Sequence, residues 1–529
     1  MTKGENMKDF KKYLDETQEI GFVEEVKQYL IYANGLPGAM PHEMIVFESG
    51  ELGQVMSLAQ KLVEILVFSD SPIKVGTRVT RTNHFLEIPV SEDLLGKTID
   101  PLGKSINSIK LSKKTSEKRP IDVTPSGIQK RQRITKPLET GVTMVDLIIP
   151  LGRGQRELVI GDRKSGKTNF IVHTVLNQAR EGHICIYTGI GKKKIDVKKV
   201  EEFFQKNGVM KNIIIVASSP EDPSSIIHLT PYTAMTIAEY FRDKGRDTLI
   251  VLDDLSTHAK FYREISLIAK RFPGRNSYPG DIFHIHSKLL ERAGNFIHEK
   301  GEVSITCLPV VETTQGDLSG YIQTNIMSMT DGHIFFDNDL FSKGRRPAIN
   351  PFLSVTRVGH QAQGQLRREI NRELISFLTL FEKVQNYVHF GAELSESIKA
   401  TLSTGEQIMN LFDQPLYRTN PPNFQVFLFC TLWTGFWSQK SLAEMRQDIE
   451  KLTTAFDKDK ELQKTINEFV EKYDSFNKLL GEIRPVTEKV FAAASGEKPK
   501  TEDDKENVEF SVERIPVAGG GMEELIGRK

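Results

Sequence analysis

One segment of the sequence has the residue types and spacing that bind phosphate groups. Gly161, Gly166, Lys167 and Thr168 match the pattern G-x-x-x-x-G-K-[ST]. The glycines would let the backbone wrap so that its N–H groups point at phosphates. Lys167 would reach the β and γ phosphates of a nucleotide, and the Thr168 hydroxyl would bind Mg²⁺. The predicted phosphate-binding set is Gly161, Asp162, Arg163, Lys164, Ser165, Gly166, Lys167, Thr168 and Asn169.

The segments on either side of this loop support the prediction. We expect a strand over residues 156–160 and a helix over residues 169–180. A helix that follows the loop adds the N–H donors of its first turn to the phosphate site. A chance loop rich in Gly and Lys would rarely have this strand and helix around it.

A carboxylate for Mg²⁺ is expected at the end of a neighbouring strand. Asp253 and Asp254 follow an apolar run over residues 248–252. The other interpretation of such an Asp is a helix N-cap, and this suits Asp254 because a helical segment follows it. We therefore predict Thr168 and Asp253 as metal ligands and Asp254 as the cap.

Binding a nucleotide does not imply hydrolysing it. Hydrolysis needs a group that orients or deprotonates water, commonly a carboxylate at the end of the adjacent strand. Lys192, Lys193 and Lys194 stand there instead. A Lys run is usually a solvated face, but its position predicts charge stabilisation of bound phosphate without chemistry.

Composition excludes some other classes. The 529 residues include 70 Lys plus Arg and 70 Asp plus Glu, so the net charge offers no general attraction to nucleic acid or anionic membranes. Cys185, Cys307 and Cys430 lie in apolar stretches and are expected to be reduced core residues of a cytosolic protein. The N-terminus lacks the apolar core of a signal peptide, and the apolar run 424–437 is too short to span a bilayer. Any membrane contact is expected through partners.

Hydrophobic patterning divides the chain into five segments. Residues 1–19 predict a short exposed helix, either an attachment segment or a frayed end, and residues 20–93 predict a small antiparallel barrel. Strands alternating with helices over residues 94–366 predict an α/β domain with a parallel sheet, and residues 367–495 predict a helical bundle. The tail, 496–529, is expected to be disordered, with residues 522–526 as a candidate partner-binding stretch.

Four motifs resemble one family, the alpha subunits of F-type ATP synthases and ATPases. They are GRGQRELVIGDR at 152–163, DDLS at 253–256, PGRNSYPGDIFHIHSKLLERA at 273–293 and RPAINPFLSVTRVG at 346–359. The resemblance runs over about residues 20–434 and implies that the α/β domain is RecA-like. It is specific to alpha, because the catalytic Gly-Glu-Arg of the beta subunit is here Gly191-Lys192-Lys193.

The resemblance implies partners and further site residues. Alpha subunits alternate with catalytic beta-type subunits in a hexamer of three each around a gamma-type shaft, with further stalk subunits, on the cytoplasmic side of the membrane. They bind ATP or ADP with Mg²⁺ without hydrolysing it. Arg357 matches the arginine finger that acts in trans on the beta site, whereas without the resemblance it would be interpreted as a surface residue at a strand end. Phe341, Arg346, Pro347 and Gln414 match the adenine contacts.

Several positions depart from the usual alpha pattern. Lys192 replaces a Gln, Leu416 replaces the second Gln of an adenine-side stretch, and Thr356 and His360 also differ. These departures keep other interpretations open. The complex could be a specialised F-type-like ATPase of a wall-less bacterium that drives gliding or other surface machinery, or the chain could be an interaction protein with a vestigial site. A helicase of the transcription-terminating type is disfavoured by neutral charge and few barrel aromatics.

Overall fold

The computed structural model describes residues 3–106, 116–299, 301–389, 395–415 and 417–495. Its chain divides into two compact units. Unit 1 comprises Met1–Ile134, Arg153–Lys167 and Val175–Asn338, and unit 2 comprises Thr135–Gly152, Thr168–Thr174 and Asp339–Lys529. Leu416 and the whole predicted tail, with its candidate partner-binding stretch, lie outside the described residues.

Unit 1 begins with the predicted barrel, which is confirmed. Its strands hydrogen-bond in the closed order β1-β2-β5-β4-β3-β6. They are β1 (Gly21–Lys27), β2 (Leu30–Asn34), β3 (Glu43–Phe47), β4 (Leu52–Leu58), β5 (Val63–Val67) and β6 (Arg78–Phe85). Ile45, Val55 and Ile65 are completely buried inside it. Closure pairs both edges of every strand, so this small sheet has no unpaired edge.

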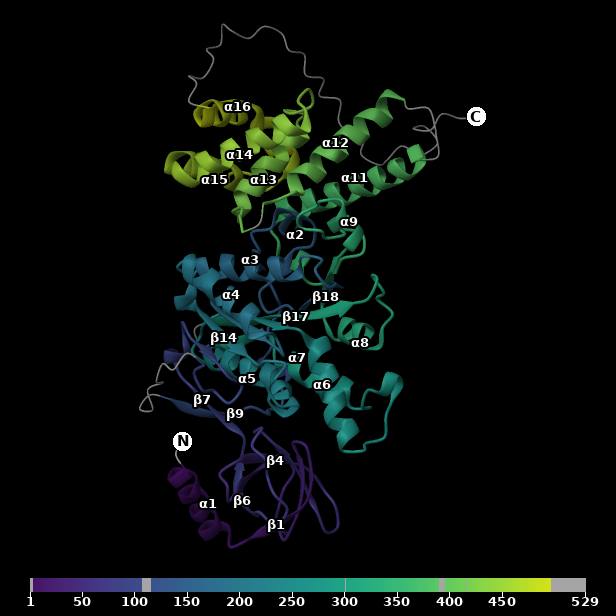
Figure 1. Cartoon of the computed structure of the whole chain (residues 1–529). Helices are drawn as coiled ribbons and strands as arrows, with labels where there is room; N and C mark the ends of the chain where they lie inside the picture. Colours follow the sequence, from purple (N-terminus) through teal and green to yellow (C-terminus); the bar gives the residue numbers. More distant parts are fainter. Residues whose placement is uncertain (1–2, 107–115, 300, 390–394, 416, 496–529) are drawn as a thin grey trace. The chain divides into compact units, whose positions relative to one another are not determined.

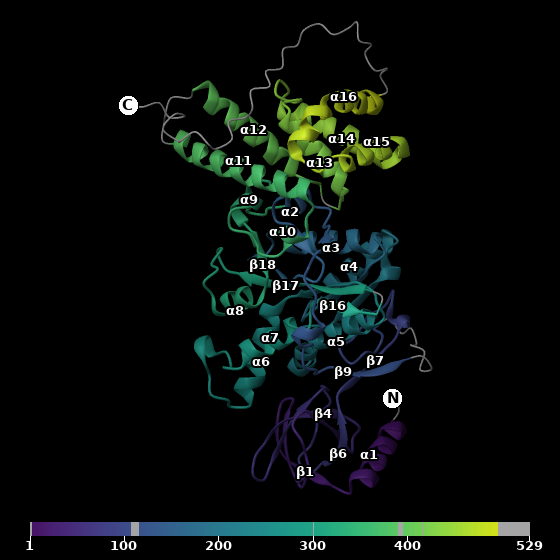
Figure 2. The same ribbon diagram turned by 180° about the vertical axis from the view of Figure 1, so that it is seen from behind.

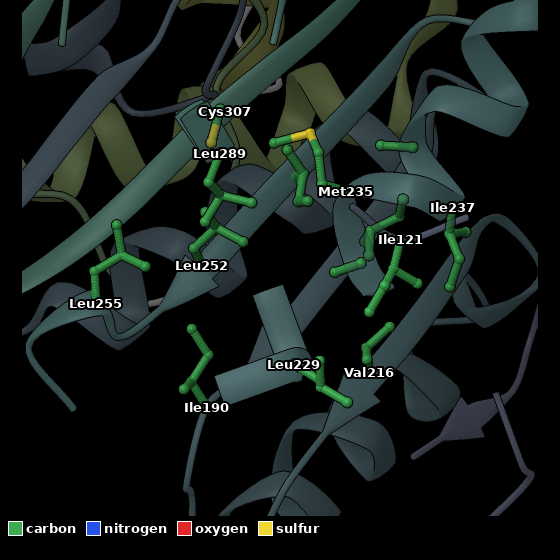
Figure 3. Close-up of a cluster of buried hydrophobic side chains, with 14 of the residues drawn as sticks. Ile121, Ile190, Val216, Leu229, Met235, Ile237, Leu252, Leu255, Leu289 and Cys307 are labelled. Atoms are coloured by element: carbon green, nitrogen blue, oxygen red, sulfur yellow. The ribbon is translucent and has the colours of Figure 1, made fainter. Parts of the chain in front are cut away.

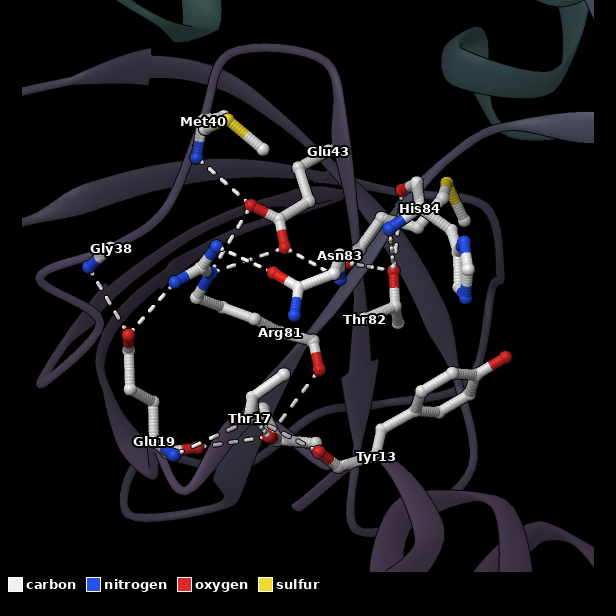
Figure 4. Close-up of polar contacts among 12 residues, drawn as sticks. Tyr13, Thr17, Glu19, Gly38, Met40, Glu43, Arg81, Thr82, Asn83 and His84 are labelled. Atoms are coloured by element: carbon white, nitrogen blue, oxygen red, sulfur yellow. Dashed lines mark hydrogen bonds and ion pairs between the residues drawn. The ribbon is translucent and has the colours of Figure 1, made fainter. Parts of the chain in front are cut away.

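A buried ion-pair network ties the barrel together (Figure 4). The guanidinium of Arg81 donates to both carboxylate oxygens of Glu43, at 3.1 and 3.2 Å, and to Glu19 at 2.8 Å. Glu43 also accepts from the backbone N–H of Met40 and Asn83, both at 2.9 Å. The buried charges are therefore paired and hydrogen-bonded, as buried charges must be.

The N-terminal helix differs from the exposed helix that the sequence predicts. Helix α1 (Lys3–Thr17) lies beside β6 (Figure 1). The Thr17 hydroxyl is 3.2 Å from that of Thr80 on β6, and the rings of Tyr13 and His84 meet edge to face. Phe10 is only 2% exposed. The apolar face of the helix is thus packed on the barrel.

The rest of unit 1 is the predicted α/β domain. Its strands hydrogen-bond in the order β18-β12-β17-β15-β13-β14-β8, all in parallel, and β16 pairs antiparallel with β17. They are β8 (Thr98–Ile99), β12 (Glu157–Asp162), β13 (Ile184–Gly189), β14 (Ile213–Ala217), β15 (Thr248–Asp253), β16 (Gly294–His298), β17 (Gly301–Thr313) and β18 (Gly332–Phe336). A two-stranded ribbon, β7 (Glu87–Val90) with β9 (Glu117–Pro120), adjoins them in the sequence.

Helices cover this sheet because its strands are apolar on both sides. Every residue of β13, β14 and β15 is buried, which requires cover on both faces. Leu252 of β15, Cys307 of β17 and Leu289 of α7 belong to the resulting core (Figure 3). The helices are α3 (Lys167–Arg180), α4 (Lys194–Lys206), α5 (Ser224–Asp243), α6 (Leu255–Ile268), α7 (Ile282–Leu290) and α8 (Tyr321–Met329). The three cysteines are free and buried, as predicted.

Unit 2 is predominantly helical, as predicted. Helices α11 and α12 lie side by side in both views (Figures 1 and 2). The helices are α2 (Thr143–Ile148), α9 (Asn338–Ser342), α10 (Gly359–Ala362), α11 (Gln365–His389), α12 (Glu396–Phe412), α13 (Pro422–Trp433), α14 (Leu442–Lys458), α15 (Lys460–Glu471) and α16 (Phe476–Ser495), with short strands β10 (Pro137–Leu138), β11 (Leu151–Gly152) and β19 (Val355–Thr356). Among the described residues, no helix has both the length and the apolar character needed to cross a bilayer.

Three buried histidines connect the helices on one face of the sheet in unit 1. His258 of α6 donates through Nε2 to the carbonyl of His228 on α5, at 3.1 Å, and its Nδ1 lies 3.0 Å from Nε2 of His286 on α7. Burial lowers the pKa of His258 from 6.5 to about 4, and it lowers those of His228 and His286 well below their ordinary value. All three rings are therefore neutral in the folded protein near neutral pH.

We expect this cluster to make the protein acid-sensitive. Neutral folded histidines contribute stability that is complete above the ordinary pKa of 6.5 and is lost as the pH falls toward 4. At about pH 5 the loss from His258 alone is about 2 kcal/mol. Urea unfolding at several pH values should show a shallower dependence in His286→Gln, which retains a donor to His258 without titrating. His284→Gln, at an exposed position on the same helix, should behave as wild type; equal pH dependence in all three proteins would contradict the assignment.

Candidate functional site

The phosphate loop connects the end of β12 to the start of α3. Gly161 cannot carry a side chain, because a Cβ there would stand 2.4 Å from the backbone oxygen of Phe336 on the neighbouring β18. Gly166 is the N-cap residue of α3 and has φ of 101°, a left-handed conformation that glycine adopts without strain. Both glycines of the motif are thus required by local geometry.

Lys167 is folded back onto the loop that carries it. Its side-chain ammonium donates to the carbonyl of Gly161 at 2.8 Å and to that of Asp162 at 2.5 Å. The residue is 7% exposed, and burial lowers the pKa of the ammonium, although nearby carboxylates such as Glu312 oppose that effect. The contacts of Lys167 are with backbone carbonyls that phosphate oxygens can replace as acceptors.

The other members of the predicted set have different local roles. The carboxylate of Asp162 accepts from the Thr313 hydroxyl at 2.5 Å and from the Gly316 N–H at 2.9 Å, which fastens the loop to the end of β17. The Ser165 hydroxyl donates to the carbonyl of Asp162 at 2.8 Å. Arg163 is exposed and lies 3.3 Å from Glu312. Lys164 is also exposed.

The strand-end carboxylates lie where the sequence placed them. Parallel pairing sets Gly189 of β13 opposite Asp253 of β15, so the residues after both strands meet at one edge. Asp254 caps α6 by accepting from the N–H of Thr257 at 2.6 Å. The prediction that Asp254 is the N-cap of the following helix is therefore confirmed.

Asp253 has two partners that sequence reasoning missed. Its Oδ2 accepts from the hydroxyl of Tyr187 on β13, at 2.8 Å, and its Oδ1 lies 2.7 Å from the ammonium of Lys192. That ammonium is also 3.3 Å from Oδ2 of Asp254. The available signal was Tyr187, which lies two residues before the end of β13. Side chains two apart in a strand point to the same face, so Tyr187 shares a face with Gly189, the residue paired with Asp253.

Burial and the neighbouring carboxylates act in opposite directions on the pKa of Lys192. Desolvation alone would lower the pKa of the Lys192 ammonium, but Asp253 and Asp254 outweigh it and the pKa is raised. Burial, then the charge of Asp253, raises the pKa of Tyr187 well above its ordinary value, so the hydroxyl is a donor. Lys192 and Tyr187 thus contact one oxygen each of the Asp253 carboxylate.

A Mg²⁺ ion at Asp253 would share the carboxylate with Lys192 and Tyr187. The ion is usually bound through one or two carboxylates together with substrate phosphates. Both Asp253 oxygens already have a protein partner, and one of these partners is a cation. Within the described residues, no group of three or more His, Cys, Asp and Glu side chains could hold a metal ion.

The four predicted adenine-side residues come together in unit 2. The guanidinium of Arg346 lies over the ring of Phe341, 3.6 Å from its centroid, and donates to the carbonyl of Phe341 at 2.9 Å. The backbone N–H of Gln414 donates to the carbonyl of Arg346 at 2.7 Å, and Pro347 follows a cis peptide bond. Tyr417 lies 3.4 Å from Asn169 of the phosphate-loop helix.

Gln414 is committed to protein contacts. Its side-chain oxygen accepts from the N–H and the hydroxyl of Thr143, at 3.0 and 3.1 Å, and its amide nitrogen donates to the carbonyl of Gly141 at 2.8 Å. The side chain is buried. It therefore joins the start of α2 to the segment that carries the other adenine-side residues.

Arg357 stands on an anchored turn. The Thr356 hydroxyl donates to the carbonyl of Pro150 at 3.0 Å, and the N–H of Gly359 donates to that hydroxyl at 3.2 Å. A Cβ on Gly359 would stand 1.6 Å from the Pro150 oxygen, so no other residue fits. Arg357 itself is exposed, and its side chain has no hydrogen-bond or ion-pair partner among the residues that the structure describes.

Comparisons with known proteins agree with this geometry. The family model for the "ATP synthase alpha/beta family, nucleotide-binding domain" matches residues 141–356, and that for the "ATP synthase alpha/beta chain, C terminal domain" matches residues 363–486. The chain is 41% identical to the ATP synthase subunit alpha of Ligilactobacillus salivarius over 427 residues, which is 80% of this chain and 85% of the relative.

A second relative covers more of the chain. The ATP synthase subunit alpha of Lactobacillus delbrueckii subsp. bulgaricus is 36% identical over 479 residues, 87% of this chain and 95% of the relative. The phosphate loop, the anchored arginine turn and these matches lead to one conclusion: the chain belongs to the ATP synthase alpha/beta family and is of the alpha-subunit type.

Proposed function

We propose that this chain is a non-catalytic alpha-type subunit that binds ATP or ADP and supplies Arg357 to the catalytic site of a beta-type partner. The partner assembly is an alternating hexamer of three of each around a gamma-type shaft, with further stalk subunits. The chain binds no nucleic acid, and the complex lies on the cytoplasmic side of the cell membrane, which the chain reaches only through partners.

The pairing of Lys192 with Asp253 carries the non-catalytic assignment. At the end of β13, where hydrolysis would need a carboxylate to orient water, the side chain is an ammonium held 2.7 Å from the carboxylate of Asp253. An ammonium with a raised pKa cannot accept a proton from water. The site then binds phosphates through the loop and stabilises their charge without the group that hydrolysis requires.

ATP and ADP are the proposed ligands, held by the phosphate loop and by Phe341, Arg346, Pro347 and Gln414. The convergence of these four residues in unit 2 supports an adenine site there. Thr168 remains the proposed hydroxyl ligand of Mg²⁺. At Asp253 the metal would meet the ammonium of Lys192, which already contacts that carboxylate.

Arg357 is the proposed catalytic residue in trans. Its turn is rigidly anchored while its side chain is exposed, which suits a cation that must reach another subunit. Such an arginine stabilises charge on the transferring phosphoryl group and is worth roughly 10³- to 10⁵-fold in rate in other enzymes.

One departure from the usual alpha pattern favours a second candidate. Lys192 stands in an ion pair at a position where the pattern has Gln, which indicates that this subunit has diverged in its nucleotide chemistry. The candidate is an alpha-like subunit of a specialised F-type-like ATPase in a wall-less bacterium, driving gliding or surface machinery. Identifying the proteins that co-purify with the native complex separates the two, since a proton-channel ring supports only the first.

We expect the isolated chain to bind ATP with a roughly micromolar Kd and to hydrolyse it negligibly. Lys167→Ala should weaken binding at least about tenfold, because it removes the cation that reaches the phosphates. Titration calorimetry measures the first quantity and a phosphate-release assay the second. Lys198→Ala, at an exposed lysine of α4 paired with Glu202, is the control and should bind as wild type. Rapid hydrolysis by the isolated chain would overturn the non-catalytic assignment.

In the assembled complex, Arg357→Ala should lower kcat about 10³-fold or more without preventing assembly. Arg357→Lys should recover little of the loss, because an ammonium lacks the planar fork of a guanidinium. Arg368→Ala, at an exposed arginine on α11, should leave turnover unchanged. Size-exclusion chromatography confirms assembly, and steady-state ATP hydrolysis gives kcat; normal turnover in an intact Arg357→Ala complex would remove this residue from catalysis.

A further inference from the structure

Lys192 is held in place by the backbone on both sides of it. Its N–H donates to the carbonyl of Ser218 at 2.9 Å, and the N–H of Gly191 donates to the Ser218 hydroxyl at 3.0 Å. The N–H of Ile190 donates to the carbonyl of Asp253 at 2.8 Å. The turn after β13 is therefore attached to the ends of both neighbouring strands, β14 and β15.

This attachment aims the Lys192 side chain at the strand-end carboxylates. The side chain is 24% exposed, whereas those of Asp253 and Asp254 are 4% and 3% exposed. The ammonium thus stands on the solvent side of two nearly buried carboxylates. A cation arriving from solvent meets it before it meets them.

The four carboxylate oxygens of this pair all have protein partners. Lys192 and Tyr187 take those of Asp253. Asp254 accepts from the N–H of Thr257 at 2.6 Å through Oδ1 and from the Thr257 hydroxyl at 3.1 Å through Oδ2. With Lys192 the local charge of the three residues is one negative unit, and without it the charge would be two negative units, a stronger attraction for a divalent cation.

The phosphate loop is within electrostatic range of this ammonium. In the sheet, β17 stands between β12, which ends in the loop, and β15, which ends in Asp253. Two strand spacings amount to about 10 Å. Lys192 therefore adds a fixed positive charge at the sheet edge to which the phosphate loop belongs.

We propose that Lys192 is a tethered cation that stands in for divalent metal, so that ATP binds this chain nearly as tightly without Mg²⁺ as with it. The inference rests on the proposed nucleotide-binding function and deepens it. The sequence predicts Asp253 as a magnesium ligand. Instead, the structure assigns its carboxylate to an internal ammonium.

The test compares ATP affinity of the full-length chain in excess Mg²⁺ and in EDTA, by titration calorimetry. For wild type we expect the two Kd values to agree within about threefold. Lys192→Gln keeps a polar side chain but frees the carboxylates, and its Kd should rise about tenfold or more when Mg²⁺ is removed. In addition, millimolar Mg²⁺ without nucleotide should raise the melting temperature of Lys192→Gln and not that of wild type.

Two further variants control for charge and for position. Lys192→Arg retains the cation and should keep the small magnesium dependence of wild type. Lys198→Gln changes an exposed lysine of α4 outside this run, paired with Glu202, and should do the same. If Lys192→Gln does not fold, the wild-type comparison decides by itself.

Each outcome bears on one claim. A wild-type Kd that rises more than about tenfold in EDTA overturns the tethered-cation role while leaving nucleotide binding intact. An unchanged magnesium dependence in folded Lys192→Gln also overturns it. Failure of wild type to bind ATP under both conditions, with Lys167→Ala indistinguishable from it, rejects the proposed nucleotide-binding function itself.

Discussion

The parallel register of the central sheet is the constraint on which the site depends. Because β12, β13, β15 and β17 run in the same direction, their carboxyl ends share one edge, and the residues that follow them meet there. The register that sets Gly189 opposite Asp253 is what brings Tyr187 and Lys192 to that carboxylate. Every residue of β13 and β15 is buried, so the covering helices enclose the strands that form this edge.

The ion pair at this edge connects the architecture to the proposed function. A buried carboxylate costs free energy unless it is paired and hydrogen-bonded, and Asp253 is both. The partner in this chain is an ammonium, which neutralises charge but cannot orient water as a base. Under the proposed function, the scaffold that would support hydrolysis with a carboxylate after β13 supports binding alone, because that residue is Lys192.

Most of the fold could be predicted from the sequence, because its hydrophobic patterns are strong. The barrel, the α/β domain and the helical domain each have a distinct period, and the predicted strand over residues 156–160 overlaps β12. The N-terminal helix was predicted to be exposed, yet Phe10 is buried. A helical period shows which residues share a face but not whether another element covers that face.

For the site, the sequence by itself determined which residues are candidates and the order in which they occur. The glycines, Lys167 and Thr168 follow a spacing that phosphate binding dictates, and Asp254 was predictable as a cap because capping is local. Only the tertiary structure decided what each charged group contacts. Lys192 and Asp253 are 61 positions apart in the sequence, and pairing between strands that are adjacent only in space brings them together. Side-chain electrostatics depends on such distances, which sequence spacing does not contain.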